Sequence, residues 1–121
     1  MIQKDIFLQG EGDAWYKRNR RYINDVLNGK EKDKVVEAIQ TIGFIPKDVL
    51  EIGCCNGYRL CLLHRMYSCH CEGIDPSYDA VNDSLYSGFP IGISVGTADE
   101  LGFADASFDT VIKNLREYHW F

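Results

Sequence analysis

The fold is decided by the stretch VLEIGCCNGYRL, residues 49–60, where an apolar run leads into an acid, a glycine, two cysteines and a second glycine. The segment DVLEI (48–52) is short, contains β-branched residues and is bounded by turn residues, which predicts a strand. The segment GYRLCLLHRMY (57–67) has the length and spacing of a helix. The residues between them therefore form a tight turn, whose glycines permit positive φ and a close approach of the backbone to a ligand.

Strands and helices alternate after this turn. Strands are predicted at CHCEGID (69–75), IGISVGT (91–97) and SFDTVIK (107–113), with a helix over 77–87 after the first of them. This alternation predicts an α/β fold, a Rossmann-like parallel sheet of about four strands with flanking helices and right-handed crossovers. Ligands of such sheets bind beyond the carboxyl ends of the strands.

Two helices are predicted before the sheet. The first spans residues 13–28 with Asp13 as its N-cap, and the second spans residues 31–42 and ends before Pro46. The chain is therefore divided into an N-terminal helical segment, residues 1–44, and a Rossmann-like domain, residues 45–121.

Length and composition limit the classes of protein to consider. With 121 residues the chain is one small domain, and its net charge of −5 argues against a nucleic-acid binder. No apolar run is long enough to span a membrane, and the N-terminus lacks the apolar core of a signal peptide. The odd number of cysteines, five, with Cys54 and Cys55 adjacent, is a poor disulfide framework and fits a reducing compartment. We therefore expect a cytoplasmic protein.

The ligand of the turn is restricted by the residues around it. A dinucleotide fingerprint that starts at Gly53 needs glycines where this chain has Cys55 and Tyr58, and Glu51 would repel a pyrophosphate. A ligand with both an ammonium and a carboxylate fits better, because Glu51 attracts the first and backbone N–H groups at a helix N-terminus serve the second. Methionine-like ends carry this pair of charges.

Three segments resemble, in order and spacing, the class I S-adenosylmethionine-dependent methyltransferases that act on small molecules. VLEIGCCNG (49–57) is similar to their first motif, an acid followed by the turn E-x-G-x-G-x-G. GIDPS (73–77) resembles the end of their second strand, and GTADELGFADASFDTVI (96–112) resembles their G-x-A-x-x-L-P-F…S-F-D-x-V segment. The resemblance covers residues 45–112 and implies S-adenosylmethionine as the cofactor.

The resemblance also implies which residues bind this cofactor. The acid at the end of the second strand, Asp75, would bond the ribose hydroxyls, and residues 97–99 would lie near the adenine. The chain departs from the family at Cys55, which stands in the place of the middle glycine; if that position needs positive φ, the strain is ~1–3 kcal/mol. The implied cofactor-binding residues are Glu51, Gly53, Cys54, Cys55, Gly57, Asp75, Pro76, Thr97, Ala98 and Asp99.

The segment EGDAWYKRNRRY (11–22) precedes the sheet. Methyltransferases of this class often use an N-terminal helix to cover the cofactor and form the substrate pocket, a role for which Trp15, Tyr16 and Arg18 are candidates. The alternative is a docking helix with an aromatic stripe and a solvated basic face. A further acid, Asp109 at the start of the last strand, is expected to be structural.

The cysteines and histidines invite comparison with a zinc site. Zinc ligands usually come in C-x₂₋₄-C pairs, whereas these cysteines are adjacent or spaced C-x₅-C, C-x₇-C and C-x-C. Cys61 has the neighbours of a small core residue, and Cys69 and Cys71 point to the opposite face of a strand from His70. No metal is therefore expected.

The family domain has seven strands, and only four are predicted here, so the chain is expected to be a truncated domain. In the family's strand order, 3-2-1-4, the strand FDTVI (108–112) lies at an exposed edge. A second copy of the chain could cover it, which predicts a homodimer. The function expected is methyl transfer from S-adenosylmethionine to a small molecule, although the short chain alone could be inactive; the alternative is a non-catalytic cofactor-binding or interaction module.

Overall fold

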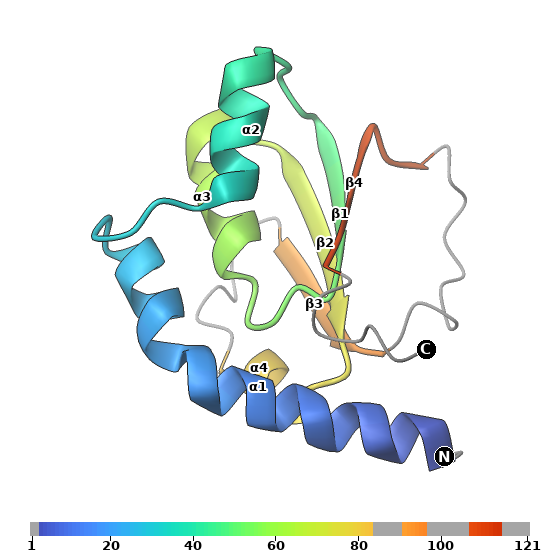
Figure 1. The fold of residues 1–121 in the computed structure, drawn as a ribbon. Helices are drawn as coiled ribbons and strands as arrows, with labels where there is room; N and C mark the ends of the chain where they lie inside the picture. Colours follow the sequence, from blue (N-terminus) through green and yellow to red (C-terminus); the bar gives the residue numbers. More distant parts are fainter. Residues whose placement is uncertain (1–2, 84–90, 97–106, 115–121) are drawn as a thin grey trace.

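The computed structural model describes residues 3–83, 91–96 and 107–114, and for residues 3–12 the backbone alone. A four-stranded parallel sheet forms its centre (Figure 1). The strands are β1 (Asp48–Ile52), β2 (His70–Asp75), β3 (Ile91–Val95) and β4 (Thr110–Lys113), in the order β3-β2-β1-β4. The predicted fold class and strand order are thereby confirmed.

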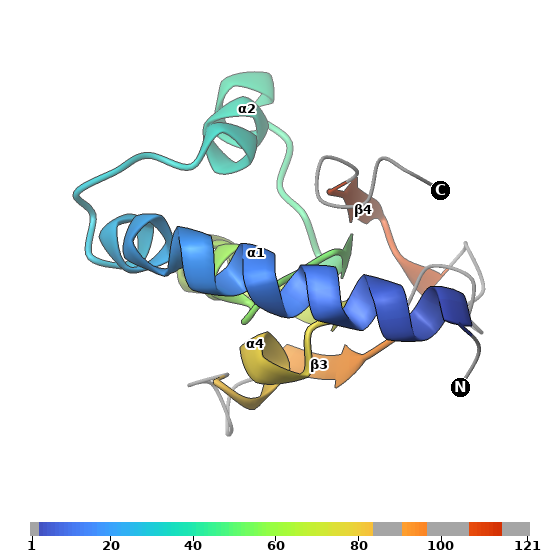
Figure 2. The same ribbon diagram turned by 60° about the horizontal axis from the view of Figure 1, so that its bottom comes forward.

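The described residues also form four helices. α2 (Lys34–Ile42) and α3 (Tyr58–Tyr67) cover one face, and α1 (Gln3–Leu27) crosses below the carboxyl ends of the strands (Figure 1). The short α4 (Tyr78–Asn82) lies beside α1 in both views (Figures 1 and 2). None of the described helices is long and apolar enough to cross a membrane.

The core lies between α2, α3 and the sheet. Val49 of β1 and Cys71 of β2 are fully buried there against Leu60 and Leu63 of α3. A second cluster joins α1 to the turn after β1, where Tyr16, Ile23 and Val26 pack with the turn residue Cys55. The N-terminal helices are thus part of the structure that supports the turn.

The prediction for the first helix was wrong at its start. α1 begins at Gln3, so Asp13 lies inside the helix and is not its N-cap. Asp13 instead reaches the start of α4: its Oδ1 accepts hydrogen bonds from Ser77 Oγ at 2.5 Å and from the Asp79 N–H at 3.2 Å. The acid therefore caps a helix that is distant in sequence.

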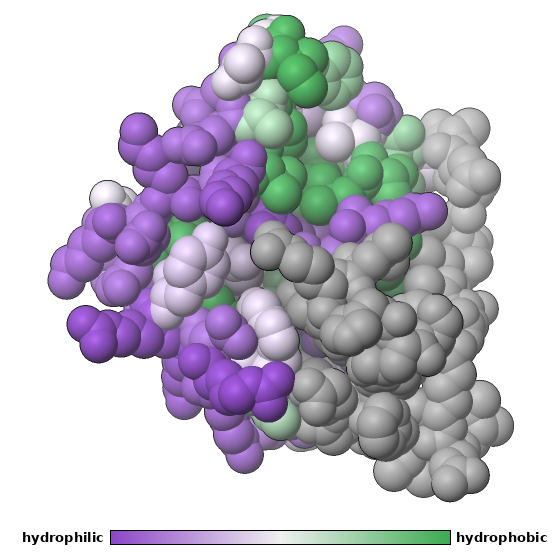
Figure 3. Space-filling view, in the orientation of Figure 1, coloured by the Kyte–Doolittle hydropathy of each residue, from purple (hydrophilic) through white to green (hydrophobic). Residues whose placement is uncertain are grey.

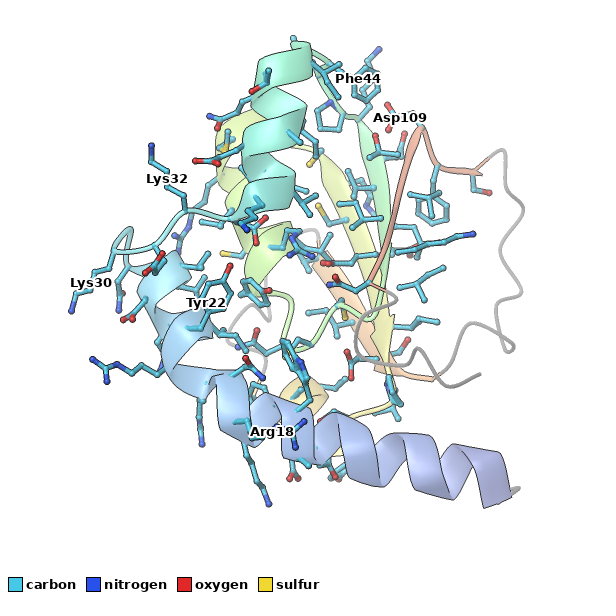
Figure 4. The ribbon with its side chains drawn as sticks, in the orientation of Figure 1. Arg18, Tyr22, Lys30, Lys32, Phe44 and Asp109 are labelled. Carbon is cyan, nitrogen blue, oxygen red and sulfur yellow. The ribbon has the colours of Figure 1, made fainter. Side chains whose placement is uncertain are left out.

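Other boundaries shift by a few residues. The residue that caps α2 is Asp33, whose carboxylate accepts from the Val35 and Val36 N–H groups. β4 begins at Thr110, later than predicted, since Asp109 before it accepts hydrogen bonds from the Lys47 and Asp48 N–H groups. Burial opposes ionisation of Asp109, but these hydrogen bonds lower its pKa. As predicted, Asp109 is structural; Figure 4 shows both Asp109 and Phe44 at the end of the sheet opposite α1.

Apolar surface gathers at that same end of the molecule. Ile42 at the end of α2, and Phe44 and Ile45 between α2 and β1, are exposed (Figure 3). Val111 of the edge strand β4 is also 46% exposed.

Candidate functional site

The turn after β1 is built from three residues with positive φ. Gly53 and Gly57 have φ of 82° and 84°, and Cys55 between them has φ of 58°. This left-handed region is costly for a residue with a Cβ, about 1–2 kcal/mol. Cys55 therefore has the positive φ at which strain was expected for a residue in the place of the family's middle glycine.

The turn packs closely on the neighbouring strand. Ile74 O accepts hydrogen bonds from the N–H groups of Gly53 at 2.8 Å and Cys54 at 3.0 Å. A Cβ at Gly73 would lie 2.7 Å from the Cβ and Sγ of Cys54, so only glycine leaves room for the turn at this position.

Asp75, the last residue of β2, holds both the turn and the following segment. Its Oδ2 accepts from the Cys55 N–H at 2.7 Å, and its Oδ1 accepts from the Ser77 N–H at 2.8 Å. The residue is 2% exposed. The carboxylate thus ties the turn after β1 to the segment after β2.

Glu51, near the end of β1, is a buried acid with one carboxylate oxygen that is not hydrogen-bonded to the described residues. It is 1% exposed; its Oε2 accepts from Arg59 Nη1 and from Asn114 Nδ2, whereas its Oε1 has no hydrogen-bond partner among the described residues. Burial raises the pKa of Glu51 to about 7, against the opposing effect of Arg59. A buried carboxylate oxygen without a donor is costly, which marks the place where a donor of a ligand would be favoured.

Arg59, in the first turn of α3, links this acid to the N-terminal segment. Its Nε and Nη2 donate to Asp33 Oδ1 and Oδ2 at 2.9 and 3.0 Å. The side chains of Arg59 and Asp33 are 7% and 1% exposed. Burial alone would lower the pKa of Arg59, but Glu51 and Asp33 raise it, so the guanidinium stays charged.

A cavity of about 360 Å³ adjoins Arg59 of α3 and Asn114, the residue that follows β4. Aromatic side chains from α1 and α3, those of Trp15, Tyr22 and Tyr58, form part of its wall; Figure 4 shows Tyr22 on α1. The other lining residues are Asn19, Lys34, Val35, Arg59 and Asn114.

The predicted residues of α1 lie in different surroundings. Trp15 lines the cavity. Tyr16 is buried, and its hydroxyl donates to Asp83 Oδ2 at 2.7 Å, so it fastens α1 beside α4. Arg18 is exposed on α1 (Figure 4). The aromatic stripe thus serves both for docking and for the cavity wall.

The other predicted cofactor residues divide between the turn and a segment outside the described residues. Gly53, Cys54, Gly57 and Pro76 are buried at the carboxyl ends of β1 and β2. Thr97, Ala98 and Asp99 lie outside the described residues.

Sequence reasoning missed Arg59, Asp33 and Asn114. One signal for Arg59 was present: a charged residue among the apolar residues LCLL, directly after a turn that follows an acid. A cation buried at that place needs carboxylate partners. Asp33 and Asn114 are distant in sequence, and no local pattern connects them with the turn.

The cysteines are free thiols, and all five are buried. Cys69 and Cys71 face the same side, with their sulfur atoms 3.5 Å apart, and His70 is exposed on the other side. Burial raises the pKa of both thiols, which keeps them protonated and unreactive. Among the described residues no group of three or more possible metal ligands is found; that the protein binds no metal stays a prediction.

The chain resembles known proteins in sequence and in fold. A family described as "Methyltransferase domain" matches residues 50–120. No curated protein matches the sequence. Among solved structures, the plantazolicin methyltransferase BpumL in complex with a monoazolic desmethylPZN analog and SAH is 17% identical, with a TM-score of 0.56, over 90% of this chain and 48% of that chain.

A second structure of BpumL, in complex with SAH, gives 16% identity and a TM-score of 0.53 over 92% of this chain and 49% of that chain. At this identity the likeness is one of fold. The chain spans about half the length of these solved structures.

Proposed function

The chain belongs to the methyltransferase-domain family, and from this premise we propose that it binds S-adenosylmethionine and takes part in methyl transfer to a small molecule. One observation carries the proposal: Glu51 Oε1 is buried and has no donor among the described residues, beside a turn with three residues at positive φ. A ligand ammonium would supply the missing donor.

The other residues at this edge of the sheet fit the remaining parts of the cofactor. The turn and the N-terminus of α3 offer N–H groups to the methionine carboxylate. By family resemblance Asp75 would bond the ribose hydroxyls, with Cys54, Cys55 and Pro76 next to it, and Thr97, Ala98 and Asp99 would contact the adenine. When bound, the cofactor supplies an electrophilic sulfonium methyl group.

We place the methyl acceptor in the cavity lined by Trp15, Tyr22 and Tyr58. It adjoins Arg59 and Asn114, the two residues that hold Glu51, so an acceptor there would be next to the methionine end of the cofactor. The aromatic walls favour a flat or apolar acceptor. Displacement at the methyl group requires mainly that the two reactants be held in line, which a preformed cavity provides. Tyr16 and Arg18 are proposed to support this wall from α1.

Titration calorimetry with S-adenosylhomocysteine tests the cofactor site at about pH 8. The wild-type chain is expected to bind, and Glu51→Gln, which keeps the shape but removes the charge, is expected to weaken binding about tenfold or more. Glu37→Gln is the matched control, since Glu37 is a surface residue of α2 paired with Lys32. Absence of binding by the wild-type chain at millimolar ligand would refute the proposal.

A second candidate function is a non-catalytic interaction module that pairs through β4, an edge strand of the described sheet. The observation in its favour is that Val111 of this edge strand is 46% exposed. Binding of cofactor with no methyl transfer to any acceptor, together with association through this edge, would favour it.

We propose that the chain is organised as a helical segment, residues 1–44, and a cofactor-binding unit, residues 45–121; the family match begins at residue 50. The five free, buried thiols support a cytoplasmic location.

The acidic net charge of −5 supports a small-molecule partner in preference to nucleic acid.

A further inference from the structure

Arg59 bridges two carboxylates that come from different parts of the chain. Its Nη1 donates to Glu51 Oε2, and its Nε and Nη2 form a two-pronged contact with Asp33 at 2.9 and 3.0 Å. All three side chains are almost completely buried. Loss of any one partner would therefore leave a buried charge without its ion pair.

Each carboxylate also has a second task. Asp33 Oδ1 caps α2, since it accepts from the Val35 and Val36 N–H groups at 3.1 and 3.0 Å. Glu51 Oε2 also accepts from Asn114 at 3.2 Å, at the end of β4. Arg59 thus connects the first turn of α2 with the acid at the end of β1.

We propose that Arg59 is a positioning residue, which fixes Glu51 with Oε2 turned inward and Oε1 left for the ammonium of the ligand. Through Asp33, Arg59 also makes the charge of Glu51 depend on the N-terminal segment. The inference rests on the proposed function, because the ammonium is that of the cofactor's methionine end.

The charged groups around Glu51 raise or lower its pKa, and the sign of each effect can be tested. The titratable groups that face it are Arg59 and Tyr58 of α3, Asp33 before α2, and Asp75 and Cys71 of β2. Arg59 favours the ionised form of Glu51, whereas burial, Asp33 and Asp75 oppose it. Because one guanidinium serves two carboxylates, removing the charge of Asp33 and removing that of Arg59 must move the pKa of Glu51 in opposite directions.

The first test follows the Glu51 carboxyl carbon by NMR in the ligand-free chain, with Glu51→Gln to assign the signal. Asp33→Asn keeps an oxygen to cap α2 and is expected to lower the pKa of Glu51. Arg59→Met is expected to raise it. A merely structural role predicts loss of stability in both variants with an unmoved pKa. If Arg59→Met does not fold, Asp33→Asn decides alone: an unchanged or raised pKa would overturn the inference.

The second test measures S-adenosylhomocysteine binding by calorimetry from about pH 5.5 to about pH 8. Binding needs ionised Glu51, so affinity should fall about tenfold per pH unit below the pKa. The midpoint should move down in Asp33→Asn and up in Arg59→Met. Arg20→Met, which removes an exposed arginine paired with Asp83, should leave the midpoint unchanged.

The two tests separate this inference from the proposed function. If the NMR shifts occur and the wild-type chain binds no S-adenosylhomocysteine at any pH, the proposed cofactor is wrong while the control of Glu51 by Arg59 stands. If the ligand binds and both midpoints stay at the wild-type value, the positioning role is wrong while the cofactor stands.

Discussion

The Asp75 carboxylate accepts a hydrogen bond of 2.7 Å from the backbone N–H of Cys55, a residue 20 positions earlier in the chain. One acid at the end of β2 thus fixes the conformation of the turn after β1. Cys55 is also the residue of this turn that has both a Cβ and a positive φ. The bond from Asp75 helps to hold this strained backbone in place.

Asp75→Asn should therefore weaken both the fold and ligand binding. The amide offers one acceptor oxygen where two are used, so either the Cys55 or the Ser77 N–H loses its partner, at a cost of about 1–3 kcal/mol. Urea unfolding measures the stability, and calorimetry with S-adenosylhomocysteine measures the affinity. Wild-type values of both would show that this carboxylate neither holds the turn nor meets the ribose.

At position 55 glycine should give a more stable protein than alanine, which is the reverse of the usual order. Cys55→Ala keeps the Cβ and its strain, whereas Cys55→Gly removes both, and the two variants lose the same thiol. We expect Cys55→Gly to be the more stable by about 1 kcal/mol. Thermal and urea unfolding of the pair measure this difference, and greater stability of the alanine variant would contradict the positive φ.

Glu51 should make the wild-type chain less stable as pH rises. Its pKa of about 7 lies above the ordinary value of 4.5, so the folded state holds a proton that the unfolded state has released. The contribution to stability is full below about pH 4.5 and is lost as pH rises through about 7. Glu51→Gln should lack this loss. Parallel curves of unfolding free energy against pH for the two chains would contradict the raised pKa.

Asp13 should contribute to stability through α4. Asp13→Ala removes the acceptor of Ser77 Oγ and of the Asp79 N–H, with an expected loss of about 1 kcal/mol. Asp13→Asn keeps an oxygen acceptor and should lose less. Urea unfolding compares them. Equal stability of the alanine variant and the wild type would show that the contact between α1 and α4 carries no energy.

The β4 edge predicts self-association, as the exposed Val111 there would gain from a second copy. Sedimentation equilibrium at micromolar concentration should give a mass above 13.8 kDa that rises with concentration. Val111→Lys, an edge charge, should shift the equilibrium toward the single chain. A constant mass of 13.8 kDa in the wild type would exclude the dimer.

The sheet could be predicted from sequence because its signals are local. DVLEI is a short apolar run between turn residues, and the bounds predicted for it, 48–52, are those of β1. The order of the strands came from family resemblance. Positive φ at Cys55 could be stated only as a condition, since side-chain type alone does not fix backbone conformation.

What the sequence did not reveal depends on contacts between distant residues. Gly10 and Gly12 disfavour a helix locally, so the first ten residues of α1 were not expected to be helical. Aspartate is a common N-cap residue, so the sequence suggested that Asp13 begins a helix. Its hydrogen-bond partners, however, lie 64 and 66 residues away. Arg59 and Asp33 are 26 residues apart, and no periodic pattern in the sequence predicts their contact.

The fastening of the N-terminal helices has a consequence for the kinetics of binding. α1 is held to α4 by Asp13 and Tyr16, and α2 is held to α3 by Asp33, so two walls of the cavity are fixed by buried or half-buried polar contacts. Little conformational entropy remains to be lost in these walls when a ligand enters. Association with the cavity should therefore be a single diffusional step, with no slow phase that comes from ordering of these helices.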